Sequence, residues 1–288
     1  MSSASSPVPT PAAALAVTPA ARAPRRRLPL TPQALVGGVL LALLLIAVIL
    51  APLLAPFDPD AVEPAAALQA PGAGHWLGTD NFGRDVLSRV LYGGRISLLM
   101  GLVAVSIGAL AGVTLGLLAG FFGGWVDGVL SWFAEVLLAF PGILLALVVV
   151  TVLGLGLFNA MLAVGIGFIP SFLRVTRGSV LAARAAEYVA AARTVGVPTP
   201  RLLLRHILPN IGRPLLVLAT IGAGGAILEG AALSFLGLGV QPPTAEWGAM
   251  LAAGQPYLRS APWIALFPGL GIFLAVLAIN LIGDGLER

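Results

Sequence analysis

The chain reads ISLLMGLVAVSIGALAGVTLGLLAG from Ile96 to Gly120, a stretch without a charged residue. A helix needs about 20 predominantly apolar residues to cross the hydrocarbon core of a bilayer. Five further apolar stretches accompany it: Leu35–Pro56, Val129–Leu153, Phe158–Val175, Ile211–Leu236 and Trp263–Ile282. The pattern predicts an all-α integral membrane protein with six transmembrane helices.

The composition supports a membrane protein and excludes several functions. Hydrophobic residues make up 58% of the chain and charged residues 10%, whereas soluble domains carry roughly 25% charged residues. The absence of cysteine excludes disulfides and thiolate-bound metal clusters. The sequence also contains no lysine, and a standard P-loop needs its lysine to reach the phosphates of ATP. If ATP powers this protein, another subunit must bind it.

Arginine placement predicts the orientation in the membrane. Four arginines precede the first span and seven lie at or between the fourth and fifth spans: Arg22, Arg25, Arg26, Arg27, then Arg174, Arg177, Arg184, Arg193, Arg201, Arg205 and Arg213. The positive-inside rule places both groups, and both termini, in the cytoplasm. These arginines flank apolar spans, so we expect no nucleic-acid partner. Residues 1–34 predict a disordered cytoplasmic tail, with a cleaved signal peptide as the alternative.

The segment 57–95 between the first two spans is expected to be an external loop. Its Arg84, Asp85 and Arg89 form either a salt-bridged cap or a contact with a binding protein. His75 reads as a loop histidine rather than a metal ligand, because no cluster of carboxylates and histidines accompanies it.

The second span carries glycines at every fourth position: Gly108, Gly112, Gly116 and Gly120. On a helix they form one smooth stripe that a second backbone can approach closely. This stripe indicates ordinary helix packing, or a moving or subunit interface as the alternative.

The cytoplasmic segment of about 176–210 predicts a helix–turn–helix outside the membrane. A helix from Glu187 should end near Gly196, because glycine is common just past a helix end. Pro198 blocks continuation, and Thr199 can cap a second short helix that runs to about His206 with Pro200 at its first position. The first helix should present Ala190, Ala191 and Ala192 as a smooth surface. Such an element is either a docking site or an amphipathic surface segment.

The segment resembles the EAA loop of importer permeases in the ABC superfamily. Alignment on Gly196 puts the two alanines of the motif at Ala191 and Ala192 and its Leu-Pro pair at Leu208 and Pro209. Ala190 stands where the family has glutamate and His206 where it has isoleucine. The resemblance implies an ATPase-coupling loop, in which we also include Arg193 and Glu187, although Glu187 is out of register with the missing glutamate.

Three further stretches, His75–Ser97, Leu228–Gly248 and Asn280–Leu286, resemble the C-type permease of dipeptide and oligopeptide importers. The resemblance implies a type I ABC importer permease fold in the bacterial inner membrane, with a permease core over 96–288. It also implies a second homologous permease, two cytoplasmic ATPases that hold ATP and Mg²⁺, and an external solute-binding protein. The chain itself would be neither an enzyme nor a cofactor carrier. A permease for nickel or another small solute is the alternative.

Glu135 and Glu229 are expected in or near the membrane, where carboxylates are costly and face the bundle interior or water. Glu229 could line the pathway or bond neighbouring helices, and Glu135 should lie near the cytoplasmic end of the third span. A gradient-driven secondary transporter is a weaker hypothesis, because the sequence shows no internal repeat. The hypothesis of a membrane enzyme is not supported, because the sequence shows no combination of a nucleophile and a base.

Overall fold

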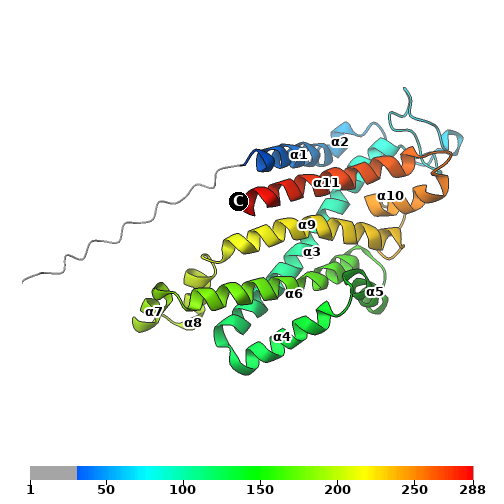
Figure 1. Ribbon diagram of the computed structural model, residues 1–288. Helices are drawn as coiled ribbons and strands as arrows, with labels where there is room; N and C mark the ends of the chain where they lie inside the picture. Colours follow the sequence, from blue (N-terminus) through cyan, green and yellow to red (C-terminus); the bar gives the residue numbers. More distant parts are fainter. Residues whose placement is uncertain (1–30, 288) are drawn as a thin grey trace, which may run out of the picture.

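The computed structural model describes residues 31–287, and within this range the regular elements are helices (Figure 1). In chain order they are α1 (Pro32–Ile49), α2 (Ala51–Leu54), α3 (Val86–Phe122), α4 (Gly124–Leu138), α5 (Gly142–Leu153), α6 (Leu157–Arg184), α7 (Glu187–Thr194), α8 (Thr199–Leu202), α9 (Gly212–Phe235), α10 (Trp247–Gly254) and α11 (Trp263–Glu287). Short 3₁₀ turns occur at Pro64–Ala66 and Gln255–Tyr257. The predicted all-α class is confirmed.

Five helices, α1, α3, α6, α9 and α11, are long and apolar enough to cross a membrane. A tail is expected over residues 1–34, and residues 1–30 of it lie outside the described residues. Helix α1 begins at Pro32, inside the expected tail. Helix α6 accommodates Pro170 in its interior, as a membrane helix can when neighbours satisfy the freed carbonyl.

The predicted third span, Val129–Leu153, is not one continuous helix. Its residues belong to α4 and α5, which meet at an angle of 94° across a short break. Pro141 lies in the break and is the N-cap of α5. Proline has no N–H to donate and disfavours helical backbone in the residue before it. The break explains why residues 31–287 contain five single-helix candidate spans, and a sixth only if the bent pair counts as one span.

Helix α3 begins ten residues earlier than the predicted start at Ile96 and has 37 residues, so it is about 55 Å long. Part of the expected loop 57–95 is therefore helical. Asp85 starts the helix as N-cap, and its Oδ2 accepts hydrogen bonds from the Ser88 amide and hydroxyl at 2.8 Å each. A side-chain cap of this kind satisfies an amide that the helix leaves free.

The helices run lengthwise through the molecule, so that its two ends differ (Figure 1). The start of α1 and the end of α11 lie at the same end as α7 and α8. The loop after α2, helix α5 and helix α10 lie at the other end. We call these the α7–α8 end and the cap end.

Helices α3 and α6 pack backbone to backbone along the glycine stripe. A Cβ atom on Gly112 would lie 2.5 Å from both the Ile169 carbonyl oxygen and the Phe172 Cβ, and one on Gly116 would lie 2.5 Å from the Thr176 Cβ. Helix α6 contributes a glycine of its own, Gly165, next to the Ala104 carbonyl of α3. The stripe is thus a helix-packing surface, as one of the two interpretations predicted.

Helix α10 is fixed to α3 by a fully buried carboxylate. Glu246 Oε1 accepts from the Ser97 hydroxyl at 2.8 Å and from the Gly248 amide at 2.9 Å, while Oε2 accepts from the Ala249 amide at 2.8 Å. The indole of Trp247 donates to the Val90 carbonyl of α3 at 2.9 Å. Both oxygens of the buried carboxylate are therefore satisfied, as a buried charge requires.

We predict that Gly112→Ala destabilises the protein by about 1–3 kcal/mol, because the added methyl group overpacks the α3–α6 contact. Gly178→Ala is the matched control on α6, since a Cβ there meets nothing within 4 Å. Thermal unfolding of the two purified variants in mild detergent checks this. Equal midpoints for both variants would contradict the close packing.

Candidate functional site

The segment after α6 forms the predicted helix–turn–helix at the α7–α8 end. Helix α7 ends at Thr194, and Gly196 has a positive φ of 76° that reverses the chain. The expected cap is wrong: Pro198 is the N-cap of α8 and Thr199 is the first helical residue, because the carbonyl of Pro198 already accepts from the Leu202 amide at 3.0 Å. A π-helical turn at Leu203–Ile207 continues the second helix to Ile207.

Helix α7 has a buried face and an exposed face. Val189 and Ala192 are buried in the main hydrophobic core, whereas Ala190 and Ala191 are exposed. The expected smooth surface therefore contains two alanines, not three. We call five exposed residues of α7 and the turn after it the α7 surface: Glu187, Ala190, Ala191, Arg193 and Val195; Tyr188 and Thr194 are exposed as well. Val195, which the sequence analysis did not single out, is 78% exposed at the tip of the turn.

The remaining predicted loop residues divide between surface and core. His206 and Leu208 are half-buried, and Pro209 is exposed. The exposed arginines Arg193, Arg201 and Arg205 outnumber Glu187, so this end of the molecule carries an excess of positive charge.

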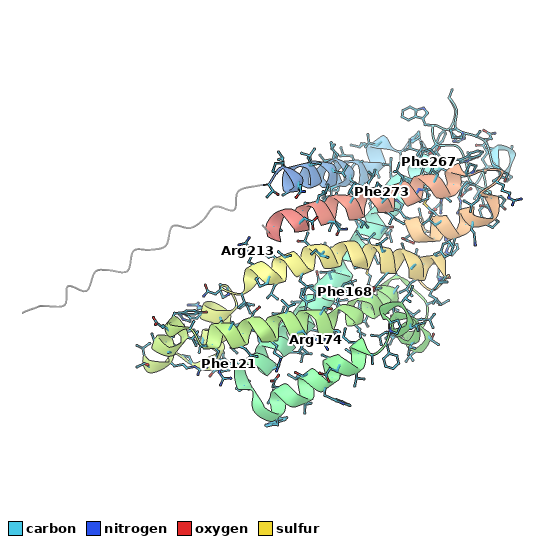
Figure 2. The ribbon with its side chains drawn as sticks, viewed as in Figure 1. Phe121, Phe168, Arg174, Arg213, Phe267 and Phe273 are labelled. Atoms are coloured by element: carbon cyan, nitrogen blue, oxygen red, sulfur yellow. The ribbon has the colours of Figure 1, made fainter. Side chains whose placement is uncertain are left out.

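Two arginines, Arg193 of α7 and Arg184 at the end of α6, contact the end of α3. The guanidinium of Arg193 lies over the Phe121 ring, 5.0 Å from its centroid, in a cation–π contact. Arg184 Nη1 donates to the Phe121 carbonyl at 2.8 Å. Figure 2 labels Phe121 at this junction. Helix α7 and the end of α6 therefore both contact the end of α3 at Phe121.

A polar cavity of about 400 Å³ lies between α4 and α6. Its lining residues are Ser131, Ala134, Glu135, Leu173, Arg174 and Arg177. At its edge Arg177 makes a two-pronged ion pair with Asp127, with Nη2 and Oδ2 2.7 Å apart. In the sequence the arginines are only orientation signals and nothing marks Asp127, since a pair 50 residues apart in the chain has no local pattern.

Glu229 lies beside the break in the bent pair. A Cβ atom on Gly142, the first residue of α5, would be 3.2 Å from Glu229 Oε1. Glu229 is half-buried, and the start of a helix carries a partial positive charge that favours a carboxylate. This geometry brings the predicted pathway residue to the point where the membrane-embedded backbone is irregular, and such backbone is tolerated only inside protein or next to a water-filled cavity.

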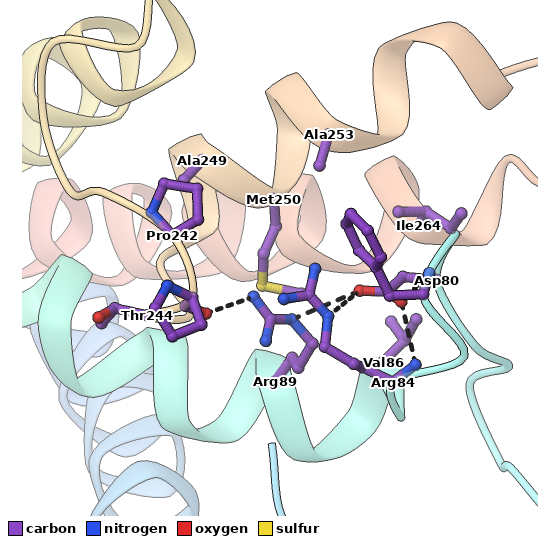
Figure 3. Close-up of a pocket in the computed structure, with 12 residues that line it drawn as sticks. Asp80, Arg84, Val86, Arg89, Pro242, Thr244, Ala249, Met250, Ala253 and Ile264 are labelled. Carbon is purple, nitrogen blue, oxygen red and sulfur yellow. Dashed lines mark hydrogen bonds and ion pairs between the residues drawn. The ribbon is translucent and has the colours of Figure 1, made fainter. Parts of the chain in front are cut away.

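The predicted salt-bridged cap forms in part: Arg84 and Arg89 pair with Asp80 and Asp60, whereas Asp85 caps α3 and contacts His75. Arg84 pairs with Asp80 at 2.7 Å, and Arg89 lies 3.7 Å from the same carboxylate and 3.0 Å from Asp60. Figure 3 shows both guanidinium groups directed at Asp80. Arg84 and Arg89 are buried, and both are paired within the cap.

His75 is a loop histidine, as expected. Its Nδ1 lies 2.9 Å from Asp85 Oδ1. Among residues 31–287 there is no group of three or more histidine, cysteine, aspartate or glutamate side chains that could hold a metal ion.

Known proteins resemble this chain over most of its length. The profile of the family described as "binding-protein-dependent transport system inner membrane component" matches residues 112–288. That of the "N-terminal TM domain of oligopeptide transport permease C" matches residues 24–71. The dipeptide transport system permease protein DppC of Alkalihalophilus pseudofirmus is 44% identical over 254 residues, which are 88% of this chain and 84% of that protein.

A second relative and a solved structure agree with this result. The glutathione transport system permease protein GsiD of Escherichia coli is 46% identical over 256 residues, with the same shares of the two chains covered, 88% and 84%. An inward-facing structure of the MetNI methionine ABC transporter matches with a TM-score of 0.55 at 20% identity, over 68% of this chain and 93% of that chain. This structural likeness shows a shared fold.

We predict that Asp127→Asn loosens α4 from α6, because it removes the charge from the ion pair with Arg177. Amide hydrogen exchange in α4 should become about tenfold faster, as expected for the loss of a charge-assisted hydrogen bond. Exchange measured by mass spectrometry on the protein in nanodiscs tests this, with Glu63→Gln, at an exposed residue of the cap end, as the control. Unchanged exchange in α4 would contradict a holding role for the pair.

Proposed function

The chain belongs to the family of binding-protein-dependent transport system inner membrane components, and we propose that it is a permease subunit that forms half of the pathway of an ATP-driven peptide importer. It is a multi-pass inner-membrane transport protein, and its fold is the importer-permease fold that the sequence predicted. Peptides are favoured as cargo because both relatives are named for peptides, a dipeptide and glutathione. A permease for nickel or another small solute is the alternative.

The observation that carries the coupling proposal is the exposed α7 surface, tied to α3 through Phe121. We propose that this surface and the turn at Gly196 dock into a groove of a separate cytoplasmic ATPase, one of two that bind ATP and Mg²⁺. Closure of the ATPases would move α7 and, through Arg193 and Arg184, the end of α3. Ala190 is exposed, so the loss of the family's glutamate changes the contact and not the fold of the loop.

The α7–α8 end then faces the cytoplasm, together with the start of α1 and the end of α11. The excess of exposed arginine at this end supports that orientation. The cap end faces outward, where an external solute-binding protein would deliver the cargo.

A second, homologous permease would complete the pathway. The support is the apolar face of α4, on which Trp125 is 80% exposed and Trp132 is 64% exposed. Helix α4 is one wall of the polar cavity and the first half of the bent pair, beside which Glu229 of α9 lies; the cavity and Glu229 would line the pathway between the two permeases.

We predict that Ala191→Trp abolishes recovery of ATPase subunits with the tagged permease, because the indole cannot enter a groove shaped for alanine. The permease should still fold, since Ala191 is exposed. Ala70→Trp, at an exposed residue of the cap end, should retain the ATPases. Purification from native membranes followed by mass spectrometry distinguishes the two. Retention of ATPases by the Ala191 variant would contradict docking at the α7 surface.

We also predict that peptide uptake in cells stops when ATP is depleted and persists when the proton and sodium gradients are collapsed with ATP maintained. A gradient-driven secondary transporter would give the opposite pattern. Uptake of labelled dipeptide by cells that express the complete complex, compared with cells that lack this chain, measures it.

A further inference from the structure

The cavity between α4 and α6 contains four charged groups at its wall or edge, and two of them are already paired. Arg177 and Asp127 neutralise each other, and the Ser131 hydroxyl donates to Asp127 Oδ1 at 3.2 Å. This pair fixes the spacing of the two helices at one edge of the cavity. It leaves one carboxylate and one guanidinium available, on opposite walls.

The available groups are Glu135 of α4 and Arg174 of α6. Both are exposed and line the cavity, and neither makes an ion pair with any residue in the range 31–287. Figure 2 labels Arg174 in the space between α6 and α4. An ionised group is costly to remove from water unless it is paired. The two groups therefore indicate a hydrated cavity that can take up a solute with both charges.

The ion pair between Asp127 and Arg177 sets a common level on the two helices, from which the positions of Glu135 and Arg174 along the helix axes can be counted. Helices α4 and α6 run in opposite directions (Figure 1), so increasing residue number in α4 and decreasing number in α6 lead the same way. Glu135 lies about 12 Å beyond Asp127 and Arg174 about 4.5 Å beyond Arg177, at 1.5 Å per residue. The backbone positions of Glu135 and Arg174 are thus offset by about 7.5 Å along the bundle.

We propose that this cavity is a binding site for a zwitterionic peptide in transit, with Glu135 holding its α-ammonium group and Arg174 its α-carboxylate. The inference rests on the proposed peptide transport and adds the site at which the permease recognises both termini. A guanidinium can bind a carboxylate through two parallel hydrogen bonds. The cavity volume of about 400 Å³ lies within the usual range of about 300–1,000 Å³ for small-molecule sites. A site with one contact for each terminus also allows release, which transport requires.

The test is ATP-driven uptake by the complete complex, with its binding protein, in proteoliposomes. Three probes are compared: alanyl-alanine, its N-acetyl derivative and its C-terminal amide. Glu135→Gln and Arg174→Gln are the variants, and Glu63→Gln at the cap end is the control. Using the same binding protein throughout assigns any change in preference to the permease.

Glu135→Gln should lower uptake of alanyl-alanine about tenfold and leave the N-acetyl derivative unchanged, the size expected for one charge-assisted contact. Arg174→Gln should likewise lower uptake of alanyl-alanine about tenfold and leave uptake of the C-terminal amide unchanged. Equal loss for all three probes, or no loss, would overturn the site while leaving the transport proposal intact. Failure of the wild-type complex to take up alanyl-alanine would instead contradict the proposed function. If Arg174→Gln only removes co-purifying phospholipid, the cavity holds a lipid phosphate and the inference is wrong.

Discussion

Helices α3 and α6 approach so closely that a side chain larger than hydrogen is excluded at successive contacts, and the other functional elements take their positions from this approach. Gly112 and Gly116 lie against the backbone and Cβ atoms of α6. Helix α4 follows α3 after a turn, and α7 follows α6, so both are placed by the same pair. Lipid tails are as apolar as the helices, so close van der Waals packing rather than hydrophobic burial must hold them together.

Charged groups in the helical bundle follow a single constraint, because each must be paired, fully hydrogen-bonded or next to water. Asp127 and Arg177 satisfy it as a pair, and Glu246 satisfies it through three donors. Glu135 and Arg174 have neither solution among the described residues and face the polar cavity. We therefore assign these two unpaired groups, Glu135 and Arg174, to binding of the solute.

The sequence predicted the helices and the exposed turn, because apolar length and the glycine at position 196 are local signals. It did not predict the break at Pro141, since an apolar run looks the same whether straight or bent and a proline is tolerated in membrane helices. Nor did it predict that Ala192 turns into the core, which depends on packing. The contacts of Asp127 and Glu246 join distant parts of the chain, and these are invisible without the fold.

Docking of the α7 surface on a cytoplasmic ATPase is tested most directly by a single introduced cysteine, because the chain contains none of its own. A cysteine at position 191 should resist a membrane-impermeant maleimide applied to intact cells. In inverted vesicles it should crosslink to a nucleotide-binding subunit, with a yield that changes when ATP is bound. Labelling from outside, or crosslinking to the ATPase from a cysteine at position 70 instead, would contradict the account.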